Sequence, residues 1–263
     1  MWIDSHCHVT AEAFDADRDR VLDRARSAGV EAFIAIGSGY GLEHNERAVQ
    51  LAEANPDVFA TVGVHPHEAA SLDDSGRSRL EDWFAHPRVV AIGECGLDYH
   101  YLHAPRGVQL EVLAEQLNQA RERDLPVSIH VRSDDDSAFD DFLELWGSEG
   151  RGELEGVLHC YTGSLDFARR ALERGLYISF SGILTFKRDR ELRAVAKALP
   201  LPRLLVETDA PLLSPEGFRG QRNEPERVRL VGEVLAATQD QPVETVAAVT
   251  TLNTRRLFRL PAP

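Results

Sequence analysis

The feature that most limits the fold of this chain is an alternation of short apolar runs with longer amphipathic stretches. Between the runs, apolar residues recur at helical spacing, as in Val21, Leu22 and Ala25. Strands that alternate with helices form parallel βαβ units, and right-handed crossovers of eight such units close into a barrel. The eight runs, rich in Val and Ile, are Trp2–Val9, Ala32–Gly37, Val58–His65, Val89–Glu94, Pro126–Arg132, Gly156–Tyr161, Leu176–Ser181 and Leu204–Asp209.

The length of the chain fits this architecture. A (β/α)8 barrel takes about 250 residues, and the chain has 263. We therefore predict an α/β fold consisting of one TIM-barrel domain over residues 1–263, with an additional C-terminal helix, Val243–Phe258, on the barrel exterior. An open doubly wound sheet is the alternative. That fold more naturally carries a Gly-rich phosphate loop after its first strand, and Ser5–His8 is not such a loop.

Composition bears on the compartment in which the protein lies and on the partners that it can bind. The N-terminus shows no secretory leader and no membrane span is visible, while three cysteines do not make a disulfide framework, so we expect a cytoplasmic protein. Nothing indicates an obligatory protein partner, and we expect a monomer or a weak oligomer. The net charge of −14 argues against binding nucleic acid through a broad basic surface. Two bound divalent cations would still add positive charge locally.

Histidines and acidic residues gather at the ends of the apolar runs. In a strand, residues i and i+2 point to the same face, so His6 and His8 should aim together. Barrel enzymes place their chemistry at the carboxyl ends of the strands, so this distribution predicts a central metal site. The other metal-competent side chains in this register are His65, His67, Glu94, His130, His159 and Asp209.

The number of candidate ligands favours two metal ions over one. A mononuclear catalytic zinc site uses three protein ligands and a water molecule, fewer than the six residues His6, His8, Glu94, His130, His159 and Asp209. A carboxylate on a central strand, such as Glu94, can bridge two ions about 3.5–4 Å apart. Imidazole ligands favour Zn or Mn and carboxylates leave room for Mg, so the identity of the ions stays open.

The remaining histidines and the cysteines are given simpler interpretations. We expect His44, His86, His100 and His103 to lie on the surface, in helices or loops, with His100 and His103 near the mouth of the barrel. The three cysteines each lie one residue from a proposed ligand, so they should face the helical shell as packing residues. They are Cys7, Cys95 and Cys160.

With these residues in place, the chain closely resembles the TatD family of metal-dependent deoxyribonucleases, in the amidohydrolase-like barrel superfamily. The resemblance runs over nearly the whole length, with one departure at Cys95, which stands where Thr, Ile or another residue is common. The matching segments are Asp4–His8, Gly63–His67, Ile92–Tyr99, Pro126–Arg132, His159–Gly163, Glu207–Leu212, Arg222–Pro225 and Asn253–Phe258.

The resemblance implies both a ligand set and an activity. It implies one ion held by His6, His8, Glu94 and Asp209, and another held by Glu94, His130 and His159. It also implies hydrolysis of DNA, as an exonuclease or general DNase, often linked to DNA repair or breakdown.

A mechanism follows from two metal ions at such a site. The ions would lower the pKa of a bound water molecule, and the resulting hydroxide would attack phosphorus in line. Asp209 would orient that water and accept its proton, while His65 and Arg132 would supply positive charge to the phosphate oxygens. Glu207 shares parity with Asp209. It is predicted to hold a third ion or fix a histidine ligand, or else to be a buried acid bonded to backbone.

Two loops are candidates for binding the substrate. In Gly182–Arg190, Phe186 could stack on a base and Lys187 could contact a phosphate. Arg222 and Asn223 belong to a second loop of the same kind. Ordinary polar loops are the alternative for both.

Two other functions stay open. The same pair of metal ions could promote attack on a carbonyl group, in a cyclic amide or in an aminoacyl-tRNA ester. The acidic net charge favours these substrates over a long stretch of bound DNA. A barrel whose metals only stabilise it, acting as a binding module, is the non-enzymatic alternative.

Overall fold

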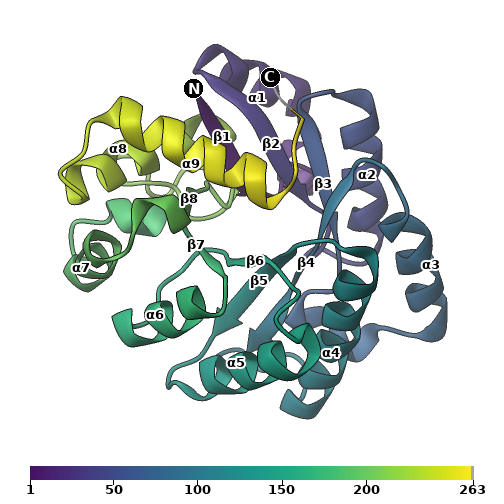
Figure 1. Ribbon diagram of the computed structural model, residues 1–263. Coiled ribbons are helices and arrows are strands. Elements are labelled where there is room, and N and C mark those ends of the chain that lie inside the picture. The colour runs from purple at the N-terminus through teal and green to yellow at the C-terminus, as the bar shows by residue number, and fades with distance from the viewer. Residues whose placement is uncertain (262–263) are drawn as a thin grey trace. The chain divides into compact units, whose positions relative to one another are not determined.

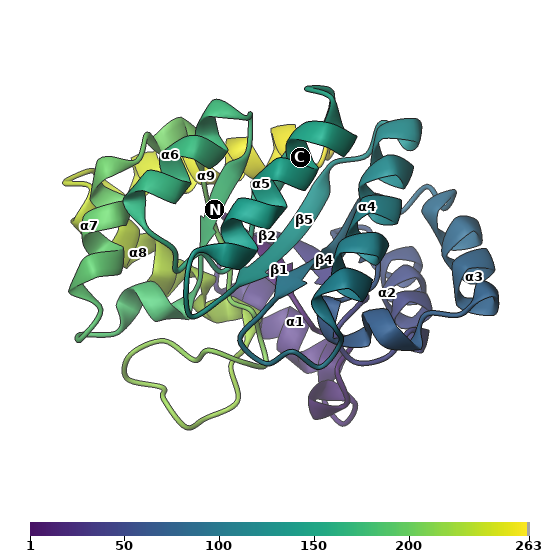
Figure 2. The same ribbon diagram turned by 90° about the horizontal axis from the view of Figure 1, so that it is seen from below.

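The computed structural model describes residues 1–261, and its eight parallel strands form one sheet in the order β1-β2-β3-β4-β5-β6-β7-β8 (Figures 1 and 2). This confirms the predicted (β/α)8 class. The strands are β1 (Trp2–Cys7), β2 (Val30–Ile36), β3 (Val58–Val62), β4 (Val89–Asp98), β5 (Val127–Arg132), β6 (Gly156–Leu158), β7 (Tyr177–Phe180) and β8 (Leu204–Val206). The α-helices are α1 (Arg18–Ser27), α2 (Glu43–Ala54), α3 (Asp74–Phe84), α4 (Arg106–Arg123), α5 (Ser137–Gly150), α6 (Leu165–Glu173), α7 (Arg190–Ala198), α8 (Val228–Thr238) and α9 (Val243–Leu257).

Contacts between residues divide the chain into two compact units. The first unit contains Met1–Ala35 and the chain from His159 onward, and the second contains Ile36–Leu158. The single domain expected over residues 1–263 stays a prediction, and its last two residues lie outside the described part of the chain.

In the first unit, the last strand meets the first. The backbone N–H of Asp209 donates to the His6 carbonyl at 3.0 Å, and the N–H of His8 donates to the Ala210 carbonyl at 2.7 Å. Helix α9 packs against β1, β8 and α8, which confirms the additional C-terminal helix (Figure 1). Asn253 on α9 fixes this packing, because its side-chain amide donates to the Leu204 carbonyl at 2.8 Å.

In the second unit, β3, β4, β5 and β6 are parallel neighbours, and α2, α4 and α5 pack against β3, β4 and β5. The sequence explains α4: its apolar residues Val112, Leu113 and Leu117 are buried at helical spacing. Two glutamines share the buried face of this helix. Gln109 accepts from the backbone N–H of Asp98 at 2.7 Å, and Gln116 accepts from that of Val64 at 2.7 Å.

Strand β4 is longer than the apolar run Val89–Glu94 predicts, because it continues to Asp98. Its register against β5 shifts between Gly93 and Cys95, so Glu94 is an extra residue in a bulge. Beyond the bulge the two strands approach closely: a Cβ on Gly96, whose φ is +151°, would lie 1.8 Å from the His130 carbonyl oxygen. This approach brings the end of β4 beside the end of β5.

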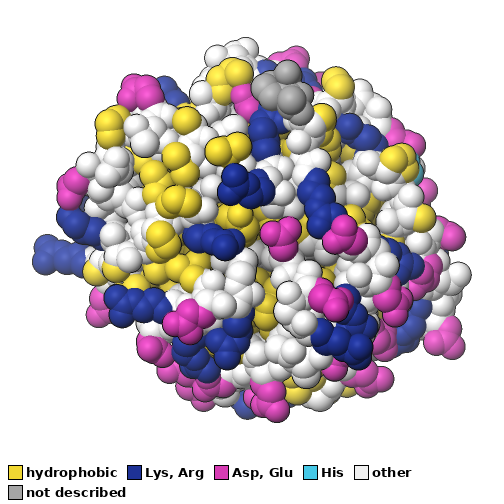
Figure 3. Space-filling model, in the orientation of Figure 1, with side chains coloured by type: hydrophobic (Ala, Val, Ile, Leu, Met, Phe, Trp, Pro, Cys, Tyr) yellow, Lys and Arg dark blue, Asp and Glu magenta, His cyan; other side chains and the backbone are white. Residues whose placement is uncertain are grey.

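The surface mixes charges of both signs. On the face shown in Figure 3, Lys and Arg side chains lie among Asp and Glu side chains, and histidine scarcely appears. In the part of the chain that the structure covers, no helix is both long enough and apolar enough to span a membrane.

Candidate metal centre

Three predicted ligands form a tight group in the first unit. Nε2 of His6 lies 3.3 Å from Nε2 of His8, and Oδ1 of Asp209 lies 3.6 and 3.5 Å from these two nitrogens. His8 follows β1 and Asp209 follows β8, so the group sits at the carboxyl ends of two strands that meet. All three side chains are buried.

A fully buried carboxylate holds the backbone of this group in place. Oδ1 of Asp4 accepts from the N–H of Thr208 at 2.9 Å and from that of His6 at 3.4 Å, and Oδ2 accepts from the Thr208 hydroxyl at 2.5 Å. Asp4 thus joins β1 to Thr208, the residue before Asp209. Asp209 has a left-handed φ of +57°. Burial raises the pKa of Asp4 to about 8, against the lowering effect of its hydrogen bonds with Thr208.

His159 joins the same group through stacking and a carboxylate. Its ring stacks on that of His6 with centroids 3.8 Å apart, and its Nδ1 lies 3.2 Å from Oε1 of Glu207. The same oxygen accepts from the N–H of Cys160 at 2.7 Å. Glu207 therefore lies where a carboxylate would orient His159, with Nε2 as the nitrogen that would bind a metal. Its other oxygen, Oε2, is buried and has no hydrogen-bond partner among the described residues.

A second group forms in the second unit from His65, Glu94 and His130. Oε1 of Glu94 lies 3.0 Å from Nδ1 of His130 and 3.5 Å from Nε2 of His65. The bulge at Glu94 is held by Ser38, whose hydroxyl accepts from the Glu94 N–H at 2.8 Å and donates to the Glu94 carbonyl at 2.9 Å. His65 was not among the predicted ligands.

Asp98 is a candidate functional residue that the sequence reasoning missed. Its Oδ2 lies 3.1 Å from Nε2 of His130 and 2.8 Å from Nε2 of His67, and it is fully buried. Burial raises the pKa of Asp98, but hydrogen bonds from His130 and His67 outweigh it, so the pKa lies well below its usual value. An ionised Asp98 fixes the proton of His130 on Nε2, which presents Nδ1 toward Glu94. The signal was available in the motif Gly96-Leu97-Asp98-Tyr99, at the end of the longer strand.

The surroundings of His65 favour another role than the expected cation, which stays a prediction. Burial lowers the pKa of this imidazole to about 4, which favours its neutral form at neutral pH. Its Nδ1 accepts from the N–H of His67 at 3.1 Å, which directs Nε2 toward Glu94. His65 therefore behaves as a further candidate ligand.

Both groups fit divalent metal ions. Tetrahedral ligands at about 2.1 Å from zinc lie about 3.4 Å from one another, and the three separations in the His6, His8 and Asp209 group are 3.3, 3.5 and 3.6 Å. Burial opposes ionisation of Asp209, but the hydrogen bond with His8 and the nearby histidines lower its pKa below the usual value. Imidazoles with ionised carboxylates suit zinc, manganese and related ions.

Comparison with known proteins identifies the family. The model of the TatD related DNase family matches residues 3–259. The chain belongs to the TatD-related DNase family. It is 38% identical over 260 residues to an uncharacterized metal-dependent hydrolase, YabD, of Bacillus subtilis, covering 99% of this chain and 100% of that protein. It is 37% identical over 256 residues to the 3'-5' ssDNA/RNA exonuclease TatD of Cronobacter sakazakii, covering 95% of each. The TatD homologue YJJV of Escherichia coli superposes with a TM-score of 0.91 and 33% identity, covering 99% of this chain and 98% of the other. The chain is thus a metal-dependent hydrolase of the TatD family.

The residues expected to bind substrate in this TatD-family chain lie in different settings. Arg132 is exposed at the end of β5, with its guanidinium 4.8 Å from the centre of the Tyr101 ring. Phe186 is half-buried after the 3-10 turn Gly182–Thr185, and the guanidinium of Arg219 lies 4.3 Å over its ring. Lys187 is exposed beside Phe186.

Arg222 and Asn223 hold the loop between β8 and α8, which is the long loop at the lower left of Figure 2. Arg222 donates to both carboxylate oxygens of Asp17 at 2.8 Å and to Glu224 at 2.9 Å. Asn223 is fully buried, and its amide donates to the Thr208 carbonyl at 2.9 Å. These bonds give both residues a structural role, which for Asn223 lies at the residue before Asp209, and substrate contact by either stays a prediction.

The expectations for the other histidines are partly wrong. His44 is buried, not at the surface, because it lies on the face of α2 that also buries Ala48, Val49 and Ala52. His86 is half-buried and lies 3.0 Å from Glu53, while His100 and His103 are exposed as expected.

Two of the three cysteines are fully buried as expected, namely Cys7 and Cys95. Cys160 is only partly buried, with Sγ 3.2 Å from the Ser181 hydroxyl. The parity argument does not extend to Cys160, because β6 ends at Leu158 and Cys160 has a left-handed φ of +43°.

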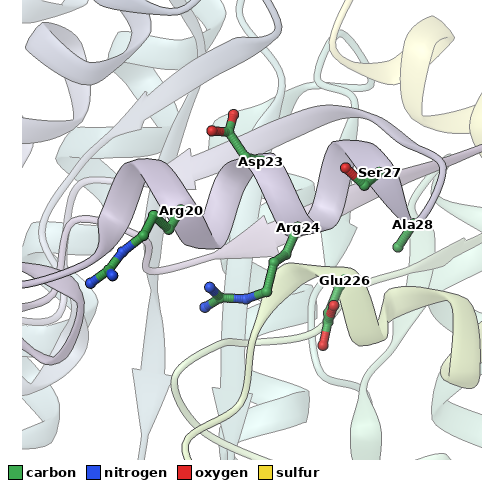
Figure 4. A pocket seen from close by; sticks show the side chains of 6 residues that line it. All are labelled: Arg20, Asp23, Arg24, Ser27, Ala28 and Glu226. Atoms are coloured by element: carbon green, nitrogen blue, oxygen red, sulfur yellow. The ribbon is translucent and has the colours of Figure 1, made fainter.

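A surface pocket of about 530 Å³ lies elsewhere in the first unit (Figure 4). Its lining residues come from one side of α1, from Arg20 to Ala28 just after the helix, and from Glu226, and none is a candidate ligand. One of them, Arg24, is bonded to Glu224 at 2.9 Å. The pocket therefore offers no site for the chemistry of the family.

Proposed function

We propose that this TatD-family chain is a divalent-metal-dependent phosphodiesterase that removes nucleotides from single-stranded DNA in the 3'-5' direction. The observation that carries the proposal is the pair of histidine and carboxylate groups at strand ends, in which all side chains but the half-buried His130 are buried. The name of the Cronobacter sakazakii relative, a 3'-5' ssDNA/RNA exonuclease, supports the substrate and the direction.

We further propose that the two groups serve one centre with two ions. His6, His8, Glu94 and Asp209 would hold one ion, and Glu94, His130 and His159 the other, with His65 as an additional ligand. When bound, the ions supply positive charge to the phosphate and make a water molecule more acidic. Glu207 would orient His159, as Asp98 would orient His130.

Asp209 is the proposed proton acceptor. Its lowered pKa means that the carboxylate is ionised at neutral pH, ready to accept a proton from the water that attacks phosphorus. The same low pKa makes the acquired proton easy to pass on to solvent. Arg132, which has a fixed positive charge, is the stronger candidate for a cation on the phosphate oxygens because burial favours the neutral form of His65. Phe186 and Lys187 are the proposed contacts to the base and to a phosphate.

Metal-analysed protein loaded separately with Mg²⁺, Mn²⁺ and Zn²⁺ tests the proposal. We expect stepwise shortening of single-stranded oligonucleotides from the 3' end, slower cleavage of duplexes, and loss of activity with a chelator. The double variant His6→Ala with Asp209→Ala is the control, since activity that survives in it would come from contamination or from another site.

Two further measurements separate the alternatives. A dihydropyrimidine and a charged tRNA are assayed with the same preparation, and turnover of either without nuclease activity would favour amide or ester hydrolysis. A melting temperature that falls on chelation, with no hydrolysis of any substrate, would favour a binding module with structural metals. A role in DNA repair or breakdown, a cytoplasmic location and a monomeric or weakly associated state stay predictions.

A further inference from the structure

An exposed cluster of aromatic rings follows β4 in the second unit. Tyr101 is 52% exposed and Leu102, which has a left-handed φ of +50°, is 46% exposed. The Tyr101 ring makes edge contacts with the rings of His100 and His67, with centroids 4.6 and 5.6 Å apart. His103 lies 4.5 Å from His67 and 5.9 Å from Tyr101. The Tyr101 ring is therefore held in one orientation while half of its surface faces solvent.

The same loop is fixed to the candidate metal ligands of this unit. The backbone N–H groups of His100 and Tyr101 donate to Oδ1 of Asp98 at 3.0 and 2.9 Å. The other oxygen of Asp98 contacts His130 and His67. One buried carboxylate thus positions both a candidate metal ligand and the exposed ring, so a nucleotide near His130 would have Tyr101 within reach.

Arg132 gives this cluster a positive charge. Its guanidinium lies 4.8 Å from the centre of the Tyr101 ring, and no carboxylate among the described residues pairs with it. The nearby acidic side chains are engaged locally: Asp134 contacts Nδ1 of His100 at 2.5 Å, and Asp135 accepts from Ser137 at 3.0 Å. An arginine without a carboxylate partner, set over an exposed ring, suits a ligand that has both a flat aromatic part and a negative charge.

We propose that Tyr101 and Arg132 form a platform on which an unpaired base of single-stranded DNA stacks, with the guanidinium also contacting a phosphate. The inference rests on the proposed nuclease function. Stacking on aromatic and guanidinium planes accepts any base, since every base has a π-face. A base inside a duplex cannot present that face, so the platform selects single strands.

The test compares steady-state kinetics of the metal-loaded protein with those of its variants. Tyr101→Ala should raise KM for a thymidine oligonucleotide about tenfold with kcat nearly unchanged. For a strand whose terminal nucleotides are abasic, KM should be the same in the two proteins. Tyr101→Phe should restore the KM of the original protein. Arg132→Ala should raise KM and weaken its dependence on salt.

Arg79→Ala is the matched control, because Arg79 also lies 4.8 Å over an aromatic ring, that of Trp83 on α3. It should leave KM unchanged. Binding of a phosphorothioate-linked thymidine strand, followed by fluorescence anisotropy, gives a readout independent of turnover. Melting temperatures confirm that each variant is folded.

The outcomes distinguish the platform from the nuclease function. Binding that depends on Tyr101, in a protein that cleaves no strand, would support the platform and reject the nuclease function. Efficient cleavage with KM and binding unchanged in Tyr101→Ala and Arg132→Ala would support the nuclease function and overturn the platform. An equal rise in KM for normal and abasic strands would also overturn it, because stacking requires a base.

Discussion

Replacing Asp98 by Asn tests how the second unit presents a ligand to metal. When His130 is neutral with its proton on Nε2, Oδ2 of Asp98 accepts from that nitrogen at 3.1 Å, and the Nδ1 lone pair on the side of Glu94 is left for a metal ion. An Asn can keep its amide oxygen on the N–H groups of His100 and Tyr101, which now donate to Oδ1. Its NH2 group then faces His130 and donates to Nε2. The histidine proton moves to Nδ1, and that nitrogen can no longer bind a metal.

Replacing one carboxylate oxygen of Asp98 by an amide nitrogen should have a large effect on metal affinity. Loss of a carboxylate that orients a metal-binding histidine lowers metal affinity or activity by about 10–100-fold, equivalent to about 1.4–2.7 kcal/mol. Calorimetric titration of Zn²⁺ or Mn²⁺ into the metal-free protein measures the affinity, and hydrolysis of single-stranded DNA measures the activity. We expect both to fall in the variant.

Asp134→Asn is the control, because Asp134 also contacts a histidine, His100, but is exposed and makes no direct contact with a candidate ligand. It should bind metal like the original protein. The reasoning is refuted if Asp98→Asn binds metal with unchanged affinity while it is folded. A melting temperature of the metal-free variant close to that of the original protein separates the tautomer effect from unfolding.

Two further predictions concern the loop that carries Asp209. Asn223→Ala removes a buried hydrogen bond to the Thr208 carbonyl, so it should lower the free energy of unfolding by about 1–3 kcal/mol in urea titrations and reduce hydrolysis. An unchanged unfolding free energy would contradict the bond. The hydrogen bond from Arg222 lowers the pKa of Asp17 to about 2. A lowered pKa gives stability that is present above the unfolded value, about 3.9, and is lost as the pH falls below it. The melting temperature should therefore decline on acidification toward pH 2 less steeply in Asp17→Asn than in the original protein, and parallel declines would refute the pairing.

The strand pattern was predictable because it depends on local hydrophobicity. The apolar runs placed all eight strands, and the match of Leu176–Ser181 to β7 (Tyr177–Phe180) shows the usual error at strand ends. The extension of β4 to Asp98 escaped prediction, because Gly96 and Asp98 are poor strand formers. Pairing with β5 and the hydrogen bonds of Gln109 to the Asp98 backbone hold this segment extended, and both come from other parts of the chain.

The sequence predicted which residues form the ligand groups better than it predicted how those residues are positioned. The side chains of His6 and His8 do point to the same place, as alternation along a strand predicts. The register of β1 against β2 shifts between Asp4 and Cys7, so regular alternation alone does not explain this orientation. Glu94 lies in a bulge and Asp209 lies three residues past β8. At neither position does alternation along a strand predict where the side chain points. Such positions are fixed by tertiary hydrogen bonds, such as those of Ser38 and Asp4, which the sequence does not reveal.

Side chains whose partners lie far along the chain were the hardest to place. The sequence predicts that Arg222 binds the substrate, but its guanidinium donates to both carboxylate oxygens of Asp17, about two hundred residues away in the chain. The sequence predicts a cation at His65, but burial lowers the pKa of its imidazole to about 4, which favours the neutral form. Charge state depends on desolvation and partners, which become known only with the fold.

Anomalous diffraction from crystals grown with Mn²⁺ tests the central claim most directly. The account predicts two peaks about 3.5–4 Å apart, with a carboxylate oxygen of Glu94 bound to each ion, His6, His8 and Asp209 around one, and His130 and His159 around the other. A single peak, or Glu94 turned away from both ions, would contradict the account.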